Sequence, residues 1–341
     1  MFTARSLPAA VSFAAILLFS CSSLAGEVNV YSARQPFLIE PMLKAFTDKT
    51  GIRVNTVFDK KSIEERLKAE GPGSPADLVL TVDIGRLNDL VVAGVAQPIL
   101  TDTLKDNIPE QYHAPDGAWW ALTSRARVLY VSKDRVQPGE ISSYAELADP
   151  KWKGRICTRP GDSDYHVALT AAMIAHKGVD ATRNWLNGLK ANLARKPQGN
   201  DRSQVKAVKE GVCDIAIGNT YYMAAMMKDP EQRAWAEAVR IVFPDQKGNG
   251  THVNVSGMVL TKSAPNRENA IQLMEFLSSG EAQKMYAEIN NEYPVKPGVE
   301  WSATVRAWGD FKADIIRLAE VAGYRTDALK LINEVDFNAG A

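Results

Sequence analysis

Two adjacent tyrosines, Tyr221 and Tyr222, are the residues whose type and spacing most directly suggest chemistry. They stand where an apolar run at 213–218 gives way to an expected helix. At the start of a helix neighbouring side chains point about 100° apart, so both phenols can lean over one cavity. Two interpretations follow: the phenols bind a metal ion, or the two rings pack as an aromatic pair.

Two other polar segments also follow expected strands. Residues 31–35 read Tyr-Ser-Ala-Arg-Gln after a strand at 27–31, and residues 162–165 read Asp-Ser-Asp-Tyr after a strand at 154–158. In α/β sheets, ligands bind beyond the carboxyl ends of strands, where helix N-termini point inward. The three segments are therefore predicted to face one cleft.

The elements that position these segments alternate between strand and helix, which predicts an α/β fold with mostly parallel strands. A chain of 341 residues exceeds what one core usually supports, so two lobes are expected. A long β-prone stretch at 119–132 can pass from one lobe to the other. The predicted lobes are residues 26–124 with 252–300, and residues 125–251 with 301–341. Strands are expected at 27–31, 52–57, 77–82, 154–158, 213–218, 239–243 and 252–260, and helices at 38–46, 63–70, 86–93, 165–176, 181–193, 203–210, 266–277 and 281–289, with a helical remainder.

Several short motifs resemble those of the bacterial periplasmic ferric-iron-binding proteins, which supply iron to an ABC transporter. The most specific is the run Gly-Asn-Thr-Tyr-Tyr at 218–222; others are Val-Tyr-Ser-Ala-Arg at 30–34, Ser-Arg-Ala-Arg-Val at 124–128 and Asn-Glu-Tyr-Pro at 291–294. The resemblance covers nearly the whole chain after residue 25. It implies the two-lobed type II periplasmic binding fold shared with transferrin lobes, with a cleft between lobes that are joined by crossing strands.

The resemblance also implies a ligand set. Several members of that family supply a histidine where this chain has Gln35, and some supply a glutamate where it has Val82. What remains is similar to the subgroup that binds Fe3+ with tyrosines alone and a synergistic carbonate. On that basis the metal ligands are Tyr165, Tyr221 and Tyr222, and Arg34 holds the anion. Arg125 and Arg127 share one side of a strand, and Arg125 is preferred as the second anion-binding residue.

Charge arithmetic agrees with a trivalent cargo. A tyrosine binds metal only after deprotonation, which costs roughly 4 kcal/mol per residue at pH 7 for a phenol of ordinary pKa. Three such costs total about 12 kcal/mol, which a 3+ ion can offset far better than a weakly held divalent ion. Three phenolates cancel the ion's charge, and an added carbonate makes arginine donors useful. Acid should therefore release the metal.

The N-terminus predicts export to the periplasm. Arg5, a short apolar run and the small residues before Ala25 form a signal peptide cleaved after Ala25, while a lipid anchor at Cys21 is the less favoured alternative. Cleavage leaves Cys157 and Cys213, predicted to form a disulfide, with two buried thiols as the alternative.

Composition narrows the partners. Basic and acidic residues both total 40, so the chain lacks the excess of positive charge that is typical of nucleic-acid-binding proteins. No nucleic-acid partner is therefore expected. The expected partners are ferric iron and an inner-membrane ABC permease, and a monomer is expected. No catalytic motif such as Gly-x-Ser-x-Gly or His-Glu-x-x-His occurs, so an enzyme is not predicted. The alternatives are a binding protein for phosphonate, sulfate or a polyamine-type solute, and the ligand module of a sensor.

Overall fold

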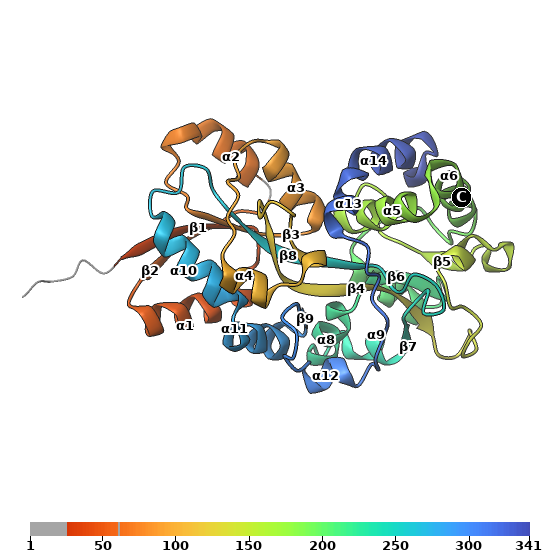
Figure 1. The fold of residues 1–341 in the computed structure, drawn as a ribbon. Coiled ribbons are helices and arrows are strands. Elements are labelled where there is room, and N and C mark those ends of the chain that lie inside the picture. The colour runs from red at the N-terminus through yellow and green to blue at the C-terminus, as the bar shows by residue number, and fades with distance from the viewer. Residues whose placement is uncertain (1–25, 61) are drawn as a thin grey trace, which may run out of the picture.

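The computed structural model describes residues 26–60 and 62–341, which form two α/β bodies side by side (Figure 1). The predicted signal peptide, with Arg5, Cys21 and the cleavage site after Ala25, lies outside this part of the chain. Within the described residues, no helix is both long and apolar enough to cross a membrane.

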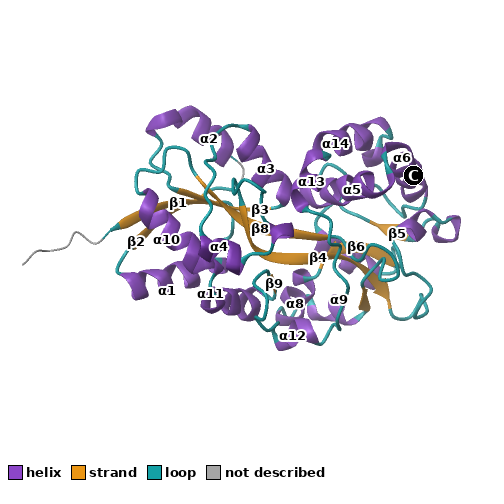
Figure 2. Ribbon diagram, viewed as in Figure 1, coloured by secondary structure: helices purple, strands orange, loops and turns teal. Residues whose placement is uncertain are grey.

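The strands form one sheet that runs through both bodies (Figure 2). Its order is β2–β1–β3–β8–β4–β6–β5, and β7 and β9 pair with β4 off this path. The strand β1 pairs in parallel with β2 and with β3, as the alternation over residues 27–82 predicted. The bounds are β1 (Glu27–Ser32), β2 (Arg53–Phe58), β3 (Leu78–Val82), β4 (Trp120–Ser132), β5 (Ile156–Cys157), β6 (Ile215–Asn219), β7 (Val239–Val242), β8 (Val253–Leu260) and β9 (Tyr293–Pro294).

The long strand β4 joins the two bodies. All 13 of its residues are buried. Its first part pairs antiparallel with β8 as far as Ala126, and from Arg127 onward it pairs antiparallel with β6. The change of partner marks the point where β4 passes from the first body to the second. The strand β8 begins beside this point, at Val253. The predicted crossing strands are thus β4 and β8, and the space between the bodies opens beside them.

Strand periodicity sorts the side chains of the second body onto two faces. On β6, Ile215 and Ile217 belong to one apolar cluster, whereas Ala216 belongs to another. On β4, Leu129 packs with the first of these clusters and Tyr130 with the second. Because side chains alternate along a strand, Arg125 and Arg127 emerge on the same face as Leu129. That face carries α5 (Asp164–Lys177).

Helix α5 is held firmly in its place. Every residue from 166 to 174 is buried, so this helix is covered on more than one side. It packs against α6 (Val179–Ala191), α13 (Leu318–Gly323) and α14 (Arg325–Glu334). Its N-terminus consequently has a fixed position at the edge of the space between the bodies (Figure 1).

The first body has its own core, and α13 connects it with the second. This core draws on strands β1, β3 and β8 and on helices on both sides of the sheet. Leu318 and Ala322 of α13 pack in it, while Val321 of the same helix packs with α5 and α14. The division of the chain into lobes at 124/125, 251/252 and 300/301 stays a prediction.

The remaining helices largely follow the predicted pattern, with three differences. The short helices at 102–107 and 233–237 were not predicted. The tail after residue 300 is not continuously helical, because an extended segment separates its short helices. The bounds are α1 (Glu40–Thr50), α2 (Ile63–Glu70), α3 (Ile84–Val92), α4 (Asp102–Asn107), α7 (Asp201–Lys209), α8 (Tyr221–Lys228), α9 (Arg233–Glu237), α10 (Arg267–Ser278), α11 (Gly280–Met285) and α12 (Ala303–Arg306).

The predicted disulfide is present. Cys157 and Cys213 are joined by a disulfide and lie 56 positions apart in sequence. Cys157 ends β5 and Cys213 precedes β6, and these two strands pair in parallel. Parallel strands deliver their carboxyl ends to the same edge, so the bridge fastens together the strands that lead to Tyr165 and to Tyr221.

Candidate metal site

A cavity of about 290 Å³ between the two bodies collects the three predicted segments. Each segment leaves a different strand of the sheet, and all three reach the cavity. Its lining includes Arg34, Gln35, Lys60, Val82, Arg86, Arg125, Arg159, Asp164, Tyr165, Tyr221, Tyr222 and Glu292.

The three tyrosines predicted as ligands lie together in this cavity. The Tyr221 hydroxyl donates a hydrogen bond to the Tyr165 hydroxyl at 3.1 Å. The rings of Tyr221 and Tyr222 are tilted, with centroids 4.3 Å apart. All three residues are half-buried. The aromatic-pair interpretation and the metal interpretation are thus compatible, because the two rings pack together while all three residues line the cavity.

The turn between β6 and α8 fixes the paired tyrosines. A Cβ atom on Gly218 would lie 2.3 Å from the Tyr130 ring, so only glycine fits there. The Tyr130 hydroxyl donates to the Asn219 carbonyl oxygen at 2.5 Å. Tyr130 therefore both fills the space beside Gly218 and holds the backbone of Asn219, just before the helix that carries the tyrosines.

All three phenols lie at helix N-termini. Tyr165 is the second residue of α5, and Tyr221 and Tyr222 are the first two residues of α8. The amides of a first helical turn lack intrahelical partners, and the helix dipole there favours negative charge. Phenolates at these positions would be stabilised by both effects.

In the metal-free protein two of these phenols hold their protons tightly. Burial raises the pKa of Tyr221 well above its usual value, and the neighbouring Tyr165 and Tyr222 add to the rise. Burial likewise raises the pKa of Tyr222, with further contributions from Tyr165 and Asp201. Only a ligand with strong positive charge would ionise such a pair at neutral pH.

Arg34, predicted to hold an anion, faces the cavity from the first body. Its side chain is almost fully buried, and its Nη2 donates to Glu292 Oε2 at 2.7 Å. Burial alone would raise the pKa of Glu292, but Arg34 and Arg125 reverse that effect and hold it below its usual value. The Nε and Nη1 of Arg34 are buried without a hydrogen-bond partner among the described residues. Two of the three guanidinium nitrogens thus have donors to offer to a ligand.

Arg125, the second predicted anion-binding residue, lies on β4 beside the crossing point. Its Nη1 donates to Ser256 Oγ at 2.8 Å. The guanidinium carbons of Arg125 and Arg127 lie 6.0 and 5.8 Å from the centroid of the Tyr165 ring. Arg127 is bound to Asp201 at 3.0 Å, whereas Arg125 lines the cavity. Its role in anion binding stays a prediction.

Sequence reasoning missed several charged residues of the site, among them Glu292, Arg159 and Asp201, together with Lys60 and Arg86 of the cavity lining. Glu292 stands within the family-like run at 291–294, which gave it no role. Arg159 follows β5, so the rule that ligands bind after strand ends could have indicated it. Asp201 begins α7 and is fully buried. Nothing in its local sequence distinguishes it from an ordinary first-turn acid.

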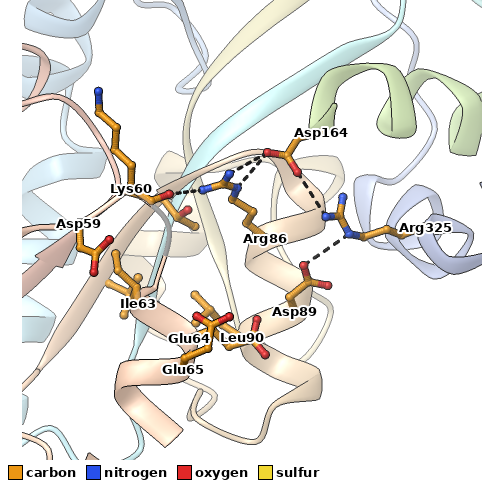
Figure 3. A pocket seen from close by; sticks show the side chains of 13 residues that line it. Asp59, Lys60, Ile63, Glu64, Glu65, Arg86, Asp89, Leu90, Asp164 and Arg325 are labelled. Carbon is orange, nitrogen blue, oxygen red and sulfur yellow. Dashed lines mark hydrogen bonds and ion pairs between the residues drawn. The ribbon is translucent and has the colours of Figure 1, made fainter. Parts of the chain in front are cut away.

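A network of ion pairs joins the two bodies next to the tyrosines (Figure 3). Arg86 of α3 donates through Nε to Asp164 Oδ2 at 3.0 Å, and Arg325 of α14 reaches Asp164 Oδ1 at 3.3 Å and Asp89 at 3.4 Å. A Cβ on Gly85 would lie 2.3 Å from Arg325 Nη1, so glycine permits this approach. Asp164, the residue before Tyr165, is therefore tied to both bodies.

The two positions that depart from the family pattern do face the cavity. Both Gln35 and Val82 line it. The valine offers no donor atom, and the glutamine amide is a weaker metal ligand than an imidazole. The two positions at which a ligand of the family is missing therefore both lie in the wall of the cavity.

Two conspicuous aromatic residues lie elsewhere. The Tyr31 hydroxyl donates to Glu70 at 2.8 Å, and the Tyr31 ring packs in the core of the first body. The His166 ring lies tilted against Phe337, with ring centroids 4.7 Å apart, and burial together with the charges of Arg127 and Arg159 lowers its pKa to about 3. This histidine is consequently neutral at pH 7.

The comparison with known proteins places the chain in a family. A profile described as bacterial extracellular solute-binding protein matches residues 41–313. The chain belongs to this family. The solute-binding protein is also 44% identical to iron uptake protein A1 of Synechocystis sp. over 90% of its own length and 86% of the relative's.

Solved structures agree in fold and in close sequence similarity. Ferric iron-binding protein A of Mannheimia haemolytica, in an open conformation, is 53% identical, with a TM-score of 0.88 over 92% of this chain and 99% of that one. The Trichodesmium protein IdiA (FutA), solved with iron and citrate ligands, is 42% identical, with a TM-score of 0.89 over 92% and 100%. The two-lobed α/β fold predicted from the sequence is confirmed.

The buried pair of Arg34 and Glu292 yields a stability prediction. Replacing Glu292 with Gln leaves the Arg34 charge buried without a counter-charge, so the free energy of unfolding should fall by about 3 kcal/mol. The matched control is Glu281→Gln, because Glu281 pairs with Lys49 at 2.8 Å on the surface and such pairs contribute about 0–1 kcal/mol. Urea unfolding of metal-free protein at pH 7 measures both. Equal losses in the two variants would contradict the interpretation.

Proposed function

We propose that this solute-binding protein captures ferric iron in the periplasm with Tyr165, Tyr221 and Tyr222 and delivers it to an inner-membrane ABC permease. The observation that carries the proposal is the meeting of three phenols from two helix N-termini in one cavity. The names of its relatives, iron uptake protein and ferric iron-binding protein, support the same cargo. In this proposal the protein binds iron and catalyses no reaction.

The donor set suits Fe3+ more than any divalent ion. Fe3+ is a hard cation that favours charged oxygen ligands, and three phenolates cancel its charge. Because burial already disfavours ionisation of Tyr221 and Tyr222, a weaker cation would not displace their protons at neutral pH. The raised pKa values thus act as a filter on the charge of the cargo.

The charge of the cavity supports an anion bound with the iron. Among the described residues that line it, five are basic and two acidic: Arg34, Lys60, Arg86, Arg125 and Arg159 against Asp164 and Glu292. Iron with three phenolates adds no net charge, so an excess of three positive charges remains. A synergistic carbonate, held by Arg34 and Arg125, would reduce it. A relative was solved with iron and citrate, so a larger carboxylate is the competing anion.

The proposed lobes give the order of events. Lobe 1 comprises residues 26–124 with 252–300, and lobe 2 residues 125–251 with 301–341. All three tyrosines belong to lobe 2, so iron binds there first, and Arg34 of lobe 1 joins when the lobes close. The contact of Arg86 with Asp164 crosses between the lobes and would stabilise the closed form. Closure by hinge motion would give a monomeric protein a distinct surface for the permease.

An absorbance titration tests the cargo and its ligands. Metal-free mature protein titrated with chelated ferric iron should develop a visible phenolate-to-iron charge-transfer band that saturates at one equivalent. The band should be weakened and shifted in each of Tyr165→Phe, Tyr221→Phe and Tyr222→Phe, because each variant loses one of the three phenolates. The control is Tyr31→Phe, which removes a hydroxyl bound to Glu70 in the first core and should leave the band unchanged.

Two outcomes would contradict this proposal. If the folded wild-type protein gives no band, the tyrosines are packing residues, and a binding protein for an anion such as a phosphonate becomes the better assignment. If the three site variants behave like Tyr31→Phe, iron binds elsewhere in the protein.

The pH dependence of iron binding follows from the phenols. Tyr221 and Tyr222 have pKa values raised above the usual range, so both are protonated at neutral pH and must release their protons on binding. Affinity should therefore fall by at least about 100-fold per unit as the pH decreases from about 8 to about 6. Competition with a chelator of known conditional affinity measures the slope, and Tyr221→Phe should reduce it by about one proton. A pH-independent affinity would exclude phenolate ligands.

A further inference from the structure

Arg159 has a position at the site that the ligand set does not explain. It lies between β5 and α5, on the same connection as Tyr165, and its side chain is 19% exposed where it lines the cavity. Its guanidinium carbon is 4.8 Å from the centroid of the Tyr165 ring, closer than those of Arg125 and Arg127. Of these three arginines it is thus the nearest to the Tyr165 ring.

The donors of Arg159 are underused. Its Nη1 lies 3.5 Å from Asp201 Oδ1, which is an ion pair but not a hydrogen bond, and its Nε and Nη1 are both buried without a hydrogen-bond partner among the described residues. Leaving a buried charged donor unpaired costs free energy, and such groups in native proteins call for an explanation. A ligand that brings acceptor oxygens into the cavity would provide it.

Asp201 keeps this arginine in position. Its carboxylate is fully buried and binds Arg127 Nη1 at 3.0 Å. It also accepts from the Asn219 amide at 3.3 Å, two residues before Tyr221. One buried acid therefore links Arg159 to the turn that carries the paired tyrosines.

The other arginines that face the cavity in the vicinity of the tyrosines have firmer partners. Arg34 donates to Glu292 at 2.7 Å, and Arg125 donates to Ser256 at 2.8 Å. Arg34 also belongs to the first body, on the opposite wall from the tyrosines. Arg159 is on the tyrosine wall, so it can reach an anion there without any movement of the first body.

We propose that Arg159 is a ligand-facing residue that donates Nε and Nη1 to a carboxylate-type oxyanion bound together with the metal, and that Asp201 positions it. This inference rests on the proposed function. In this proposal the anion is first bound on the same wall of the cavity as the tyrosines. Iron and anion therefore bind together before Arg34 contributes.

The test uses full-length mature protein, with bicarbonate as the probe. Wild type, Arg159→Gln, Arg159→Lys and Asp201→Asn are loaded with ferric iron in bicarbonate-free buffer and in bicarbonate, and the rate of iron loss to a competing chelator is followed in the charge-transfer band. Bicarbonate should slow the loss from wild type by about ten- to a hundredfold, the worth of a charge-assisted hydrogen bond. Arg159→Gln should lose that effect, measured as the ratio of its two rates of iron loss with and without bicarbonate.

The other variants separate positioning from folding. Arg159→Lys keeps the charge but lacks the fork, and Asp201→Asn keeps the shape but lacks the charge that orients Arg159, so both should show a reduced bicarbonate effect. The control is Arg183→Gln, because Arg183 is exposed and pairs with Asp180 and Glu334 on the surface. Thermal unfolding of each metal-free variant reports folding independently of iron, and if Arg159→Gln does not fold, Arg159→Lys decides.

Each remaining outcome is decisive. If bicarbonate slows iron loss from Arg159→Gln as much as from wild type, the inference is overturned and the iron proposal stays intact. If Arg159→Gln does not fold, the same result in Arg159→Lys has the same meaning. No bicarbonate effect in wild type that shows the band would overturn the oxyanion role of Arg159. A wild-type protein with no band at all would instead refute the proposed function.

Discussion

Buried positive charge is the constraint on which this cleft depends. Arg34, Arg125 and Arg127 are almost fully buried around the tyrosines, and Arg159 is largely so. The buried acids beside them, Glu292, Asp201 and Asp83, are too few to balance them. Taking charges out of water is costly unless they are paired. The protein therefore carries a local excess of buried positive charge beside the tyrosines, which the proposed phenolates and anion would reduce.

The same constraint explains why the phenols are neutral and yet ready to ionise. Burial holds the protons on Tyr221 and Tyr222, while helix N-termini and nearby guanidinium groups favour the charged forms. These opposing effects leave ionisation to the ligand. The backbone that sets this balance is rigid, because β5 and β6 are parallel neighbours joined by the Cys157–Cys213 disulfide. Ion pairs of Asp164 with Arg86 and of Arg325 with Asp89 connect this part of the second body to the first.

Much of this arrangement could be predicted from the sequence, because it depends on local patterns. Alternating apolar segments gave the parallel strands β1 to β3, the length of the stretch at 119–132 indicated the crossing strand, and the two cysteines suggested their own pairing. The ends of strands indicated where Tyr165, Tyr221 and Tyr222 would meet. Their assignment as ligands came from a family resemblance, since a pair of tyrosines at a helix start is equally consistent with aromatic packing.

What the sequence could not give are the charged partners of the site. The residues of the Arg34–Glu292 pair are 258 positions apart, and Arg127 and Asp201 are 74 apart. No local pattern joins such residues, because each contact exists only once the body that contains it has folded. The packing of α13 against both cores, and the extended segment before it, also depend on tertiary contacts that override local helix preference.

The most direct test of the central claim is an anomalous difference map, measured at the iron absorption edge from a crystal of iron-loaded protein. The account predicts one strong peak in the cavity, within bonding distance of the phenol oxygens of Tyr165, Tyr221 and Tyr222. A peak bound by Glu292 or Asp164 without the phenols, or no peak in the cavity of a protein that contains one equivalent of iron, would contradict it.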